Sequence, residues 1–276
     1  MKRVLTAIVA LPILLYTIWS QNPYFFAALT AIAALLALRE FYGLASRVGG
    51  TPQLVVGSAA ALMILASFVI ARPSLAVAAM IALSIVSLAA TLLSSDEMRN
   101  SLASASTTVF GVVYVALLPG CLIGVRMLPD AVSQLTAPHL ASKLLTMFFA
   151  LVMMTDTGAY YVGRSIGRHK LAPRISPGKT IEGAIGGFVA AMVTGLLCKL
   201  TFFSEIPIAH AIGLGAAIGL LGQIGDLAES MLKRGAGVKD SGHLLPGHGG
   251  MLDRIDSVLF CAPLFYYYAR LLASSL

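Results

Sequence analysis

Charged side chains are scarce in this chain of 276 residues: they make up 11% of it, whereas 58% of the residues are hydrophobic. Because ordinary soluble domains are about a quarter charged, this composition excludes a normal wetted surface and indicates that the solvent is lipid. The alternation typical of a membrane β-barrel is also missing, since runs such as Ala59–Ala71 are apolar on every face. The sequence therefore predicts an all-α polytopic membrane protein.

Signals of secretion and of small disulfide-bonded or metal-bound domains are missing as well. Each of the three cysteines lies in an apolar stretch without a partner at ligand spacing, so neither a disulfide framework nor a metal knuckle is indicated. Lys2 and Arg3 precede an apolar run, but no small-residue cleavage site follows Ser20. The first apolar segment is therefore expected to stay in the protein as a span.

About nine stretches are apolar over the length of about 20 residues that a transmembrane helix needs. No polar linker and no internal repeat divides the chain. We expect a bundle of about nine transmembrane helices in a single membrane domain, residues 1–276, with amino-terminal helices in 1–140 and catalytic helices and loops in 141–276. The expected spans are Val4–Ser20, Tyr24–Leu44, Leu54–Ala71, Ala76–Leu93, Thr107–Val125, Leu144–Val162, Ile181–Leu200, Ala209–Leu227 and Ser257–Leu272.

The basic residues are distributed unevenly between the two sides of the membrane. If the amino terminus lies inside, most of the 19 lysines and arginines fall in cytoplasmic loops and helix ends, which fits the positive-inside rule. Two long loops crowded with Gly, Pro, Lys, Arg, Asp and His fall on this same side, so we expect them to form an active site facing the cytoplasm of a bacterial inner membrane. The basic residues are scattered and lack interleaved aromatics, which argues against nucleic acid as a partner.

The segment from Ser230 to Asp256 reads SMLKRGAGVKDSGHLLPGHGGMLDRID and resembles the signature of the phosphatidate cytidylyltransferase family. The preceding GDLAES and the stretch from Asp156 to Gly183 resemble the family too, although Gly178 stands where many members have a second lysine. The residues that match the signature are Ser230, Lys233, Arg234, Lys239, Asp240, Pro246, His248, Gly249, Gly250, Asp253, Arg254 and Asp256.

The resemblance implies an enzyme of phospholipid biosynthesis that transfers a cytidylyl group from CTP to phosphatidate, giving CDP-diacylglycerol and pyrophosphate. The expected partners are CTP and the membrane lipid phosphatidate, and a homodimer is left open. The catalytic residues it implies are Asp226, Lys233, Arg234, Lys239, Asp240, His248, Asp253 and Arg254. The substrate-binding residues it implies are Ser176, Lys179, Glu182, Ser230, Gly249 and Gly250.

Carboxylates occur on both sides of the glycine-rich loop. Asp226 lies at helical spacing from Ser230 and Lys233, and Asp253 and Asp256 are three residues apart. Magnesium prefers oxygen ligands and typically joins one or two carboxylates to substrate phosphates, so we predict Mg²⁺ at Asp226, Asp253 and Asp256. Two alternatives stay open: Asp226 as a structural ion pair with Lys233 or Arg234, and Asp256 as a brace for Arg254.

The loop glycines are expected to let backbone N–H groups approach phosphate oxygens, and the neighbouring lysines and arginines supply positive charge. The segment Ser176–Thr180 ends like a phosphate-binding P-loop, but Pro173 stands where that motif needs its first glycine. We predict instead that Ser176 and Lys179 bind phosphate near the start of the helix that begins at Ile181. Glu182 either caps this helix or contacts substrate.

A membrane transporter is the alternative from a different class. In that case Asp156, Asp226 and Glu229 would form the path of a coupling cation. Transporters usually place such charges near the midplane between repeated halves, whereas the conspicuous residues of this chain fall in loops. The sequence therefore favours the enzyme.

Overall fold

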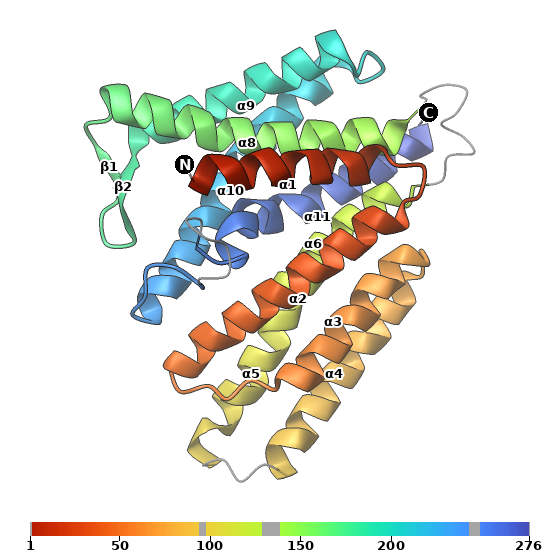
Figure 1. Ribbon diagram of the computed structural model, residues 1–276, viewed down its shortest axis with the longest axis vertical. Coiled ribbons are helices and arrows are strands. Elements are labelled where there is room, and N and C mark those ends of the chain that lie inside the picture. The colour runs from red at the N-terminus through yellow and green to blue at the C-terminus, as the bar shows by residue number, and fades with distance from the viewer. Residues whose placement is uncertain (1, 94–97, 129–138, 243–248, 276) are drawn as a thin grey trace. The chain divides into compact units, whose positions relative to one another are not determined.

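The computed structural model describes residues 2–93, 98–128, 139–242 and 249–275 (Figure 1). These residues are grouped in two compact units. The first unit comprises Met1–Met127 and Leu232–Ile255, and the second comprises Leu128–Met231 and Asp256–Leu276. The signature segment is thus divided between the two units. Leu232–Ile255 groups with the amino-terminal helices, whereas its first residues and Asp256 belong to the second unit.

The first unit is a set of apolar helices, in which α3 lies next to α4 and the axis of α1 runs at an angle to theirs (Figure 1). The π-helical turn η2 lies just before Pro119. Proline has no N–H to donate to the preceding turn, which explains why the helix widens there. The elements are α1 (Lys2–Trp19), α2 (Tyr24–Arg47), α3 (Leu54–Val69), α4 (Pro73–Leu93), η1 (Met98–Asn100), α5 (Ser101–Val112), η2 (Val113–Leu117) and α6 (Leu118–Arg126).

The side chain of Tyr42 of α2 packs between α3 and α5. Its hydroxyl donates a hydrogen bond of 2.8 Å to the carbonyl of Thr108 on α5, and the side chain is buried. Its ring occupies the space that side chains at Gly57 and Gly111 would fill. The small residues of α3 and α5 therefore admit a large aromatic side chain between the helices.

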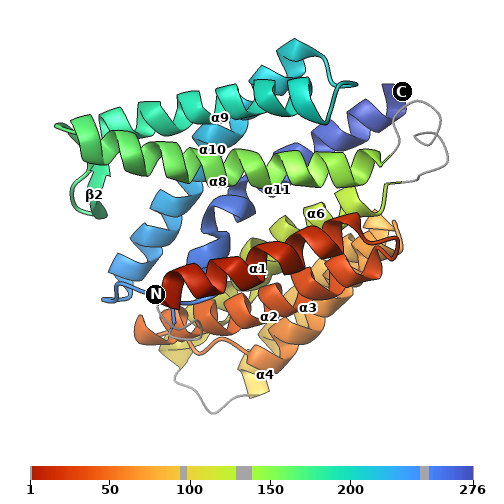
Figure 2. The same cartoon turned by 45° about the horizontal axis from the view of Figure 1, so that its top comes forward.

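The second unit contains α8 (Leu140–Ile166), β1 (Lys170–Ala172), β2 (Ser176–Thr180), α9 (Ile181–Thr201), most of α10 (Ile208–Gly235) and most of α11 (Leu252–Ser275). Helices α8 and α9 lie side by side in both views (Figures 1 and 2). A Cβ atom at Gly187 would lie 2.6 Å from the carbonyl oxygen of Thr155, so glycine is what allows this approach.

The predicted helical membrane architecture is confirmed at this level. Each expected span falls on helical residues of the described chain, with Thr107–Val125 divided among α5, η2 and α6, and six helices are long and apolar enough to cross a membrane. Two shorter apolar helices are Val9–Trp19 and Leu54–Val69. Helix α11 is outside both sets, since three tyrosines and Arg270 lower its hydropathy. The count of nine spans and the single domain divided near residue 140 stay predictions.

The β-hairpin is an element that the sequence analysis did not predict. Strands β1 and β2 pair antiparallel, with Lys170 opposite Thr180 and Ala172 opposite Ser176. The connecting turn closes through a hydrogen bond of 3.1 Å from the N–H of Ile175 to the carbonyl of Ala172. Pro173 and Pro177 disfavour a helix here, so the Ser176–Thr180 segment is a strand that leads directly into α9.

Candidate active site

Helix α10 ends in a glycine turn that opens the signature loop. The N–H of Val238 donates to the carbonyl of Lys233, and the N–H of Gly237 donates to that of Arg234, each at 3.0 Å. Gly237 has a φ of 70°, the left-handed conformation that such a helix end requires. The left-handed backbone at the end of α10 therefore explains why residue 237 is glycine. This reason is different from the predicted one, which was the approach of backbone N–H groups to phosphate.

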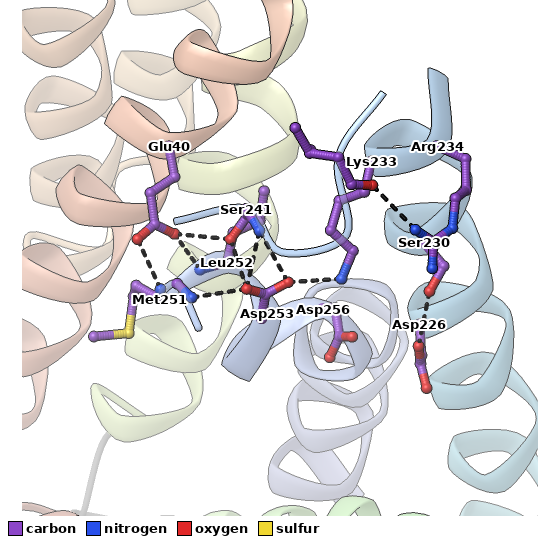
Figure 3. Close-up of polar contacts among 12 residues, drawn as sticks. Glu40, Asp226, Ser230, Lys233, Arg234, Ser241, Met251, Leu252, Asp253 and Asp256 are labelled. Carbon is purple, nitrogen blue, oxygen red and sulfur yellow. Dashed lines mark hydrogen bonds and ion pairs between the residues drawn. The ribbon is translucent and has the colours of Figure 1, made fainter. Parts of the chain in front are cut away.

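Asp253, in the first turn of α11, accepts hydrogen bonds from three parts of the first unit (Figure 3). Its carboxylate accepts hydrogen bonds from the backbone N–H of Gly250 at 2.7 Å and from the N–H and hydroxyl of Ser241, each at 3.0 Å. The ammonium of Lys233 lies 2.6 Å away. The Asp253 side chain is only 6% exposed, so this charge is held in a fixed direction by the protein.

Glu40 of α2 joins the same cluster, and the sequence analysis missed it. Its carboxylate accepts hydrogen bonds from the N–H groups of Met251, at 3.0 Å, and Leu252, at 2.8 Å, and from the hydroxyl of Ser241, at 3.1 Å (Figure 3). The available signal was a carboxylate inside an expected membrane span, which is costly and by default functional.

The glycines of the loop are close to these two carboxylates. A Cβ atom at Gly242 would lie 2.6 Å from Glu40 Oε1, and one at Gly250 would collide with Ser241 Oγ and Glu40 Oε2. Gly249 has a φ of 80°, which a side chain would strain. Glycine is therefore required here by the carboxylates, and contact of Gly249 and Gly250 with substrate stays a prediction.

In the second unit, Lys179 of β2 forms an ion pair of 2.6 Å with Asp226 of α10. The hydroxyl of Ser230, one turn along the helix, lies 3.4 Å from the same carboxylate. The proposed alternative pairing of Asp226 with Lys233 is wrong, because Lys233 reaches Asp253 instead. Glu229, on the same stretch of helix, is fully buried.

The hairpin is fixed to the start of α9 by two side chains. Thr180 caps the helix, and its hydroxyl accepts a hydrogen bond of 3.1 Å from the N–H of Gly183. Glu182 accepts from the N–H groups of Arg168, at 3.0 Å, and His169, at 3.2 Å, and lies 2.7 Å from the His169 ring. Glu182 thus holds the entrance of the hairpin, while a role in substrate binding stays a prediction.

The other predicted residues are placed as follows. Lys239, Asp240 and Arg254 are exposed, and Ser176 pairs in β2 away from the helix start. Arg234 donates to the carbonyl of Val238 at 3.2 Å, and Asp256 accepts from the N–H of Ser257 at 2.6 Å. His248 lies outside the described residues, so its role stays a prediction.

The donor chemistry of the predicted metal residues fits a hard cation. Asp226 and Asp253 each have a lysine ammonium at 2.6 Å, so each carboxylate already accommodates a positive charge. Within the described ranges, no group of three or more His, Cys, Asp or Glu side chains is close enough to hold a metal ion. Magnesium needs only one or two carboxylates when water and substrate phosphate complete its shell.

The fold and the site together define a multi-pass helical membrane protein with lysine–carboxylate ion pairs on α10, α11 and β2. A family model described as the cytidylyltransferase family matches residues 1–272. The chain belongs to this family, as the signature predicted. This membership favours the enzyme over the transporter alternative.

Relatives over nearly the whole length carry a common name. The chain is 33% identical to a phosphatidate cytidylyltransferase from Synechocystis sp., with 98% of this chain and 97% of the relative aligned. It is 36% identical to one from Staphylococcus aureus, with 95% and 96% aligned. A further one, from Bacillus subtilis, is 48% identical over 127 residues, which are 45% of this chain and 47% of the relative.

Proposed function

We propose that this enzyme transfers a cytidylyl group from CTP to phosphatidate, giving CDP-diacylglycerol and pyrophosphate for phospholipid biosynthesis. The observation that carries the proposal is the family match across residues 1–272, together with relatives of that name aligned over at least 95% of this chain. The ion-paired lysines and carboxylates on α10, α11 and β2 support it, because both substrates are polyanions.

Cytidylyl transfer requires the enzyme to compensate the negative charges of its substrates, more than to transfer a proton. A phosphate monoester has a second pKa near 6, so the phosphate of phosphatidate is largely dianionic at neutral pH and needs no general base. Its oxygen attacks the α-phosphorus of CTP, and the bond from that phosphorus to the bridging oxygen of pyrophosphate breaks. The protein has to hold two anions in line and stabilise the charge of the leaving group.

The lysines and arginines of the site are suited to this task. Lys233 and Lys179 are held beside carboxylates, and Arg234 and Arg254 lie at the ends of α10 and α11. We propose that these cations contact the phosphates of CTP and phosphatidate, and that the predicted carboxylates, Asp226, Asp253 and Asp256, supply the one or two ligands that magnesium needs beside water and phosphate. When bound, magnesium would supply a point of positive charge that screens the triphosphate.

The direct test supplies purified full-length protein with phosphatidate, magnesium and CTP labelled at the α-phosphate. We expect the label in the extracted lipid as CDP-diacylglycerol, because the α-phosphate stays with the cytidylyl group. CTP labelled at the γ-phosphate is the control and should leave its label in pyrophosphate. Label that never enters the lipid fraction would show that the proposed reaction is wrong.

Removal of divalent cations is expected to stop the reaction. Without a cation, the triphosphate and the dianionic phosphate would repel each other, and the carboxylates of the site would add to that repulsion. Initial rates should fall to background in EDTA and return when magnesium is added in excess. Full turnover in metal-free buffer would contradict the magnesium assignment.

We propose that the site faces the cytoplasm of a bacterial inner membrane, on the basis of the unequal distribution of basic residues. Lys170 and Lys239 are exposed. Cysteines introduced at these positions should react with an impermeant maleimide only after the inner membrane has been permeabilised. The three native cysteines are buried, so their background should be low. A cysteine at Ser204, in the exposed connection after α9, should react in intact cells. The reverse pattern would overturn this topology.

A further inference from the structure

The start of α11 is stabilised by a side chain from another helix. The first N–H groups of any helix have no partner within that helix, so side chains or water must satisfy them. At α11 these groups are the N–H of Met251 and the N–H of Leu252, and both donate to the carboxylate of Glu40. A negative charge at this position also interacts favourably with the positive end of the helix dipole.

The same carboxylate contacts both ends of the described loop. Ser241, before residues 243–248, lies 3.1 Å from Glu40 Oε2, and Gly242 and Gly250 leave room for the carboxylate. The Ser241 hydroxyl has one hydrogen and lies within 3.1 Å of both Glu40 and Asp253. Glu40 therefore fixes the peptide that runs directly into Asp253 and shares a donor with it.

We propose that Glu40 is a positioning residue for cytidylyl transfer: it fixes the Gly250–Asp253 turn so that the Asp253 carboxylate and the Lys233 ammonium keep their productive geometry. This inference rests on the proposed function. Glu40 acts through its hydrogen bonds to the loop and to the start of α11, and it does so from a helix whose sequence carries no part of the signature.

A carboxylate is the side chain that these contacts require. Among the described residues, the three hydrogen-bond partners of Glu40 are all donors: two backbone N–H groups and one hydroxyl. Glutamine has the same shape, but it would turn its NH₂ group towards at least one of these donors and would lack the charge. Glu40→Gln therefore tests the contacts without leaving a cavity.

The first experiment compares Glu40→Gln with Tyr42→Phe, a control on the same helix that removes a buried hydrogen bond remote from the loop. We expect Glu40→Gln to lower kcat by about tenfold, which is the usual size for a residue that orients a ligating group. The KM values for CTP and phosphatidate should stay within about threefold, because in this proposal Glu40 acts on the loop and not on either substrate. Tyr42→Phe should leave kcat within about twofold, even if it lowers the unfolding temperature.

Amide hydrogen exchange gives a readout that does not depend on activity. In Glu40→Gln, the NH₂ group replaces the oxygen that accepts from Met251 or from Leu252, so one of these two N–H groups loses its acceptor and a peptide covering residues 249–256 should exchange faster. The same peptide should be unchanged in Tyr42→Phe. Unchanged exchange in Glu40→Gln would overturn the proposal.

Gly242 allows a double-mutant cycle, because the three nearest atoms that a Cβ there would meet all belong to Glu40. Gly242→Ala alone should lower kcat by about tenfold, since the carboxylate must move. In a Glu40→Ala background the same change should have an effect of less than about twofold, because the carboxylate that the Cβ would meet is then absent and the two effects are coupled. Additive effects would contradict the proposal.

The outcomes separate this inference from the proposed function. If the wild-type protein makes CDP-diacylglycerol and Glu40→Gln matches it in kcat, the positioning role is wrong and the function stands. Parallel loss of kcat and thermal stability in Glu40→Gln and Tyr42→Phe would likewise reduce Glu40 to a structural role. If the wild-type protein makes no CDP-diacylglycerol, the proposed function is wrong. Hydrogen exchange in Glu40→Gln, and the unfolding temperatures of the Glu40 and Gly242 variants, then still show whether Glu40 holds the loop.

Discussion

Asp253→Asn is expected to lower kcat by at least about a hundredfold, the scale on which removal of a preorganised electrostatic group acts. The asparagine keeps the shape but removes the charge that faces Lys233, and it turns an NH₂ group towards donors from Gly250 or Ser241. Asp226→Asn should act in the same direction, because it removes the partner of Lys179. The measurement is the initial rate at saturating CTP, phosphatidate and magnesium.

Glu205→Gln is the matched control for this experiment. Glu205 follows α9 and forms an ion pair of 2.5 Å with Lys143, so the chemical change is the same but lies outside the proposed site. Its rate should stay within about twofold of the wild type, as expected for a partly exposed ion pair. If Asp253→Asn also kept such a rate, the assignment of chemistry to α11 would be wrong.

Lys233→Met is expected to have two opposite effects. It should lower kcat/KM for CTP by about a hundredfold, because it removes a cation that we propose to face the phosphates in the transition state. In the absence of CTP it should raise the affinity for a divalent cation, since the ammonium that competes for the Asp253 carboxylate is removed. Lys179→Met should repeat this pattern at Asp226.

Manganese binding, followed by electron paramagnetic resonance, measures the second effect without turnover. Lys199→Met, at the end of α9, is a control because that ammonium donates to the carbonyl of Ser204 and contacts no carboxylate of the proposed site. It should change neither CTP kinetics nor manganese affinity. An unchanged manganese affinity in both Lys233→Met and Lys179→Met would show that the ion pairs do not compete with a metal.

The helices were predictable because lipid imposes length and composition on each span. Expected span Leu144–Val162, for example, lies inside α8, which continues for about a turn at either end because polar residues such as Lys143 and Arg164 tolerate the membrane boundary. The β-hairpin was not predictable in the same way. It is too short for a periodic signal, and its pairing of Lys170 with Thr180 depends on a turn around Pro173.

The signature residues were predictable as a set, but their partners were not. Spacing along α10 suggested that Asp226 pairs within the helix, whereas its ammonium comes from Lys179 of the hairpin. Glu40 was missed because a single carboxylate in an apolar segment gives no spacing pattern. Its partner Met251 lies 211 positions further along the chain, and sequence periodicity reports only on near neighbours.

The distance in sequence between Glu40 and Met251 has a consequence for how the enzyme is made. Ribosomes add about 5–20 residues per second, so about 10–40 seconds pass between synthesis of the carboxylate and synthesis of the N–H groups that it will bind. During that interval α2 has to enter the bilayer with a charge whose final partners do not yet exist. A nascent chain that stops short of α11 therefore lacks the N–H groups that Glu40 binds, and this contact can form only when translation is almost finished.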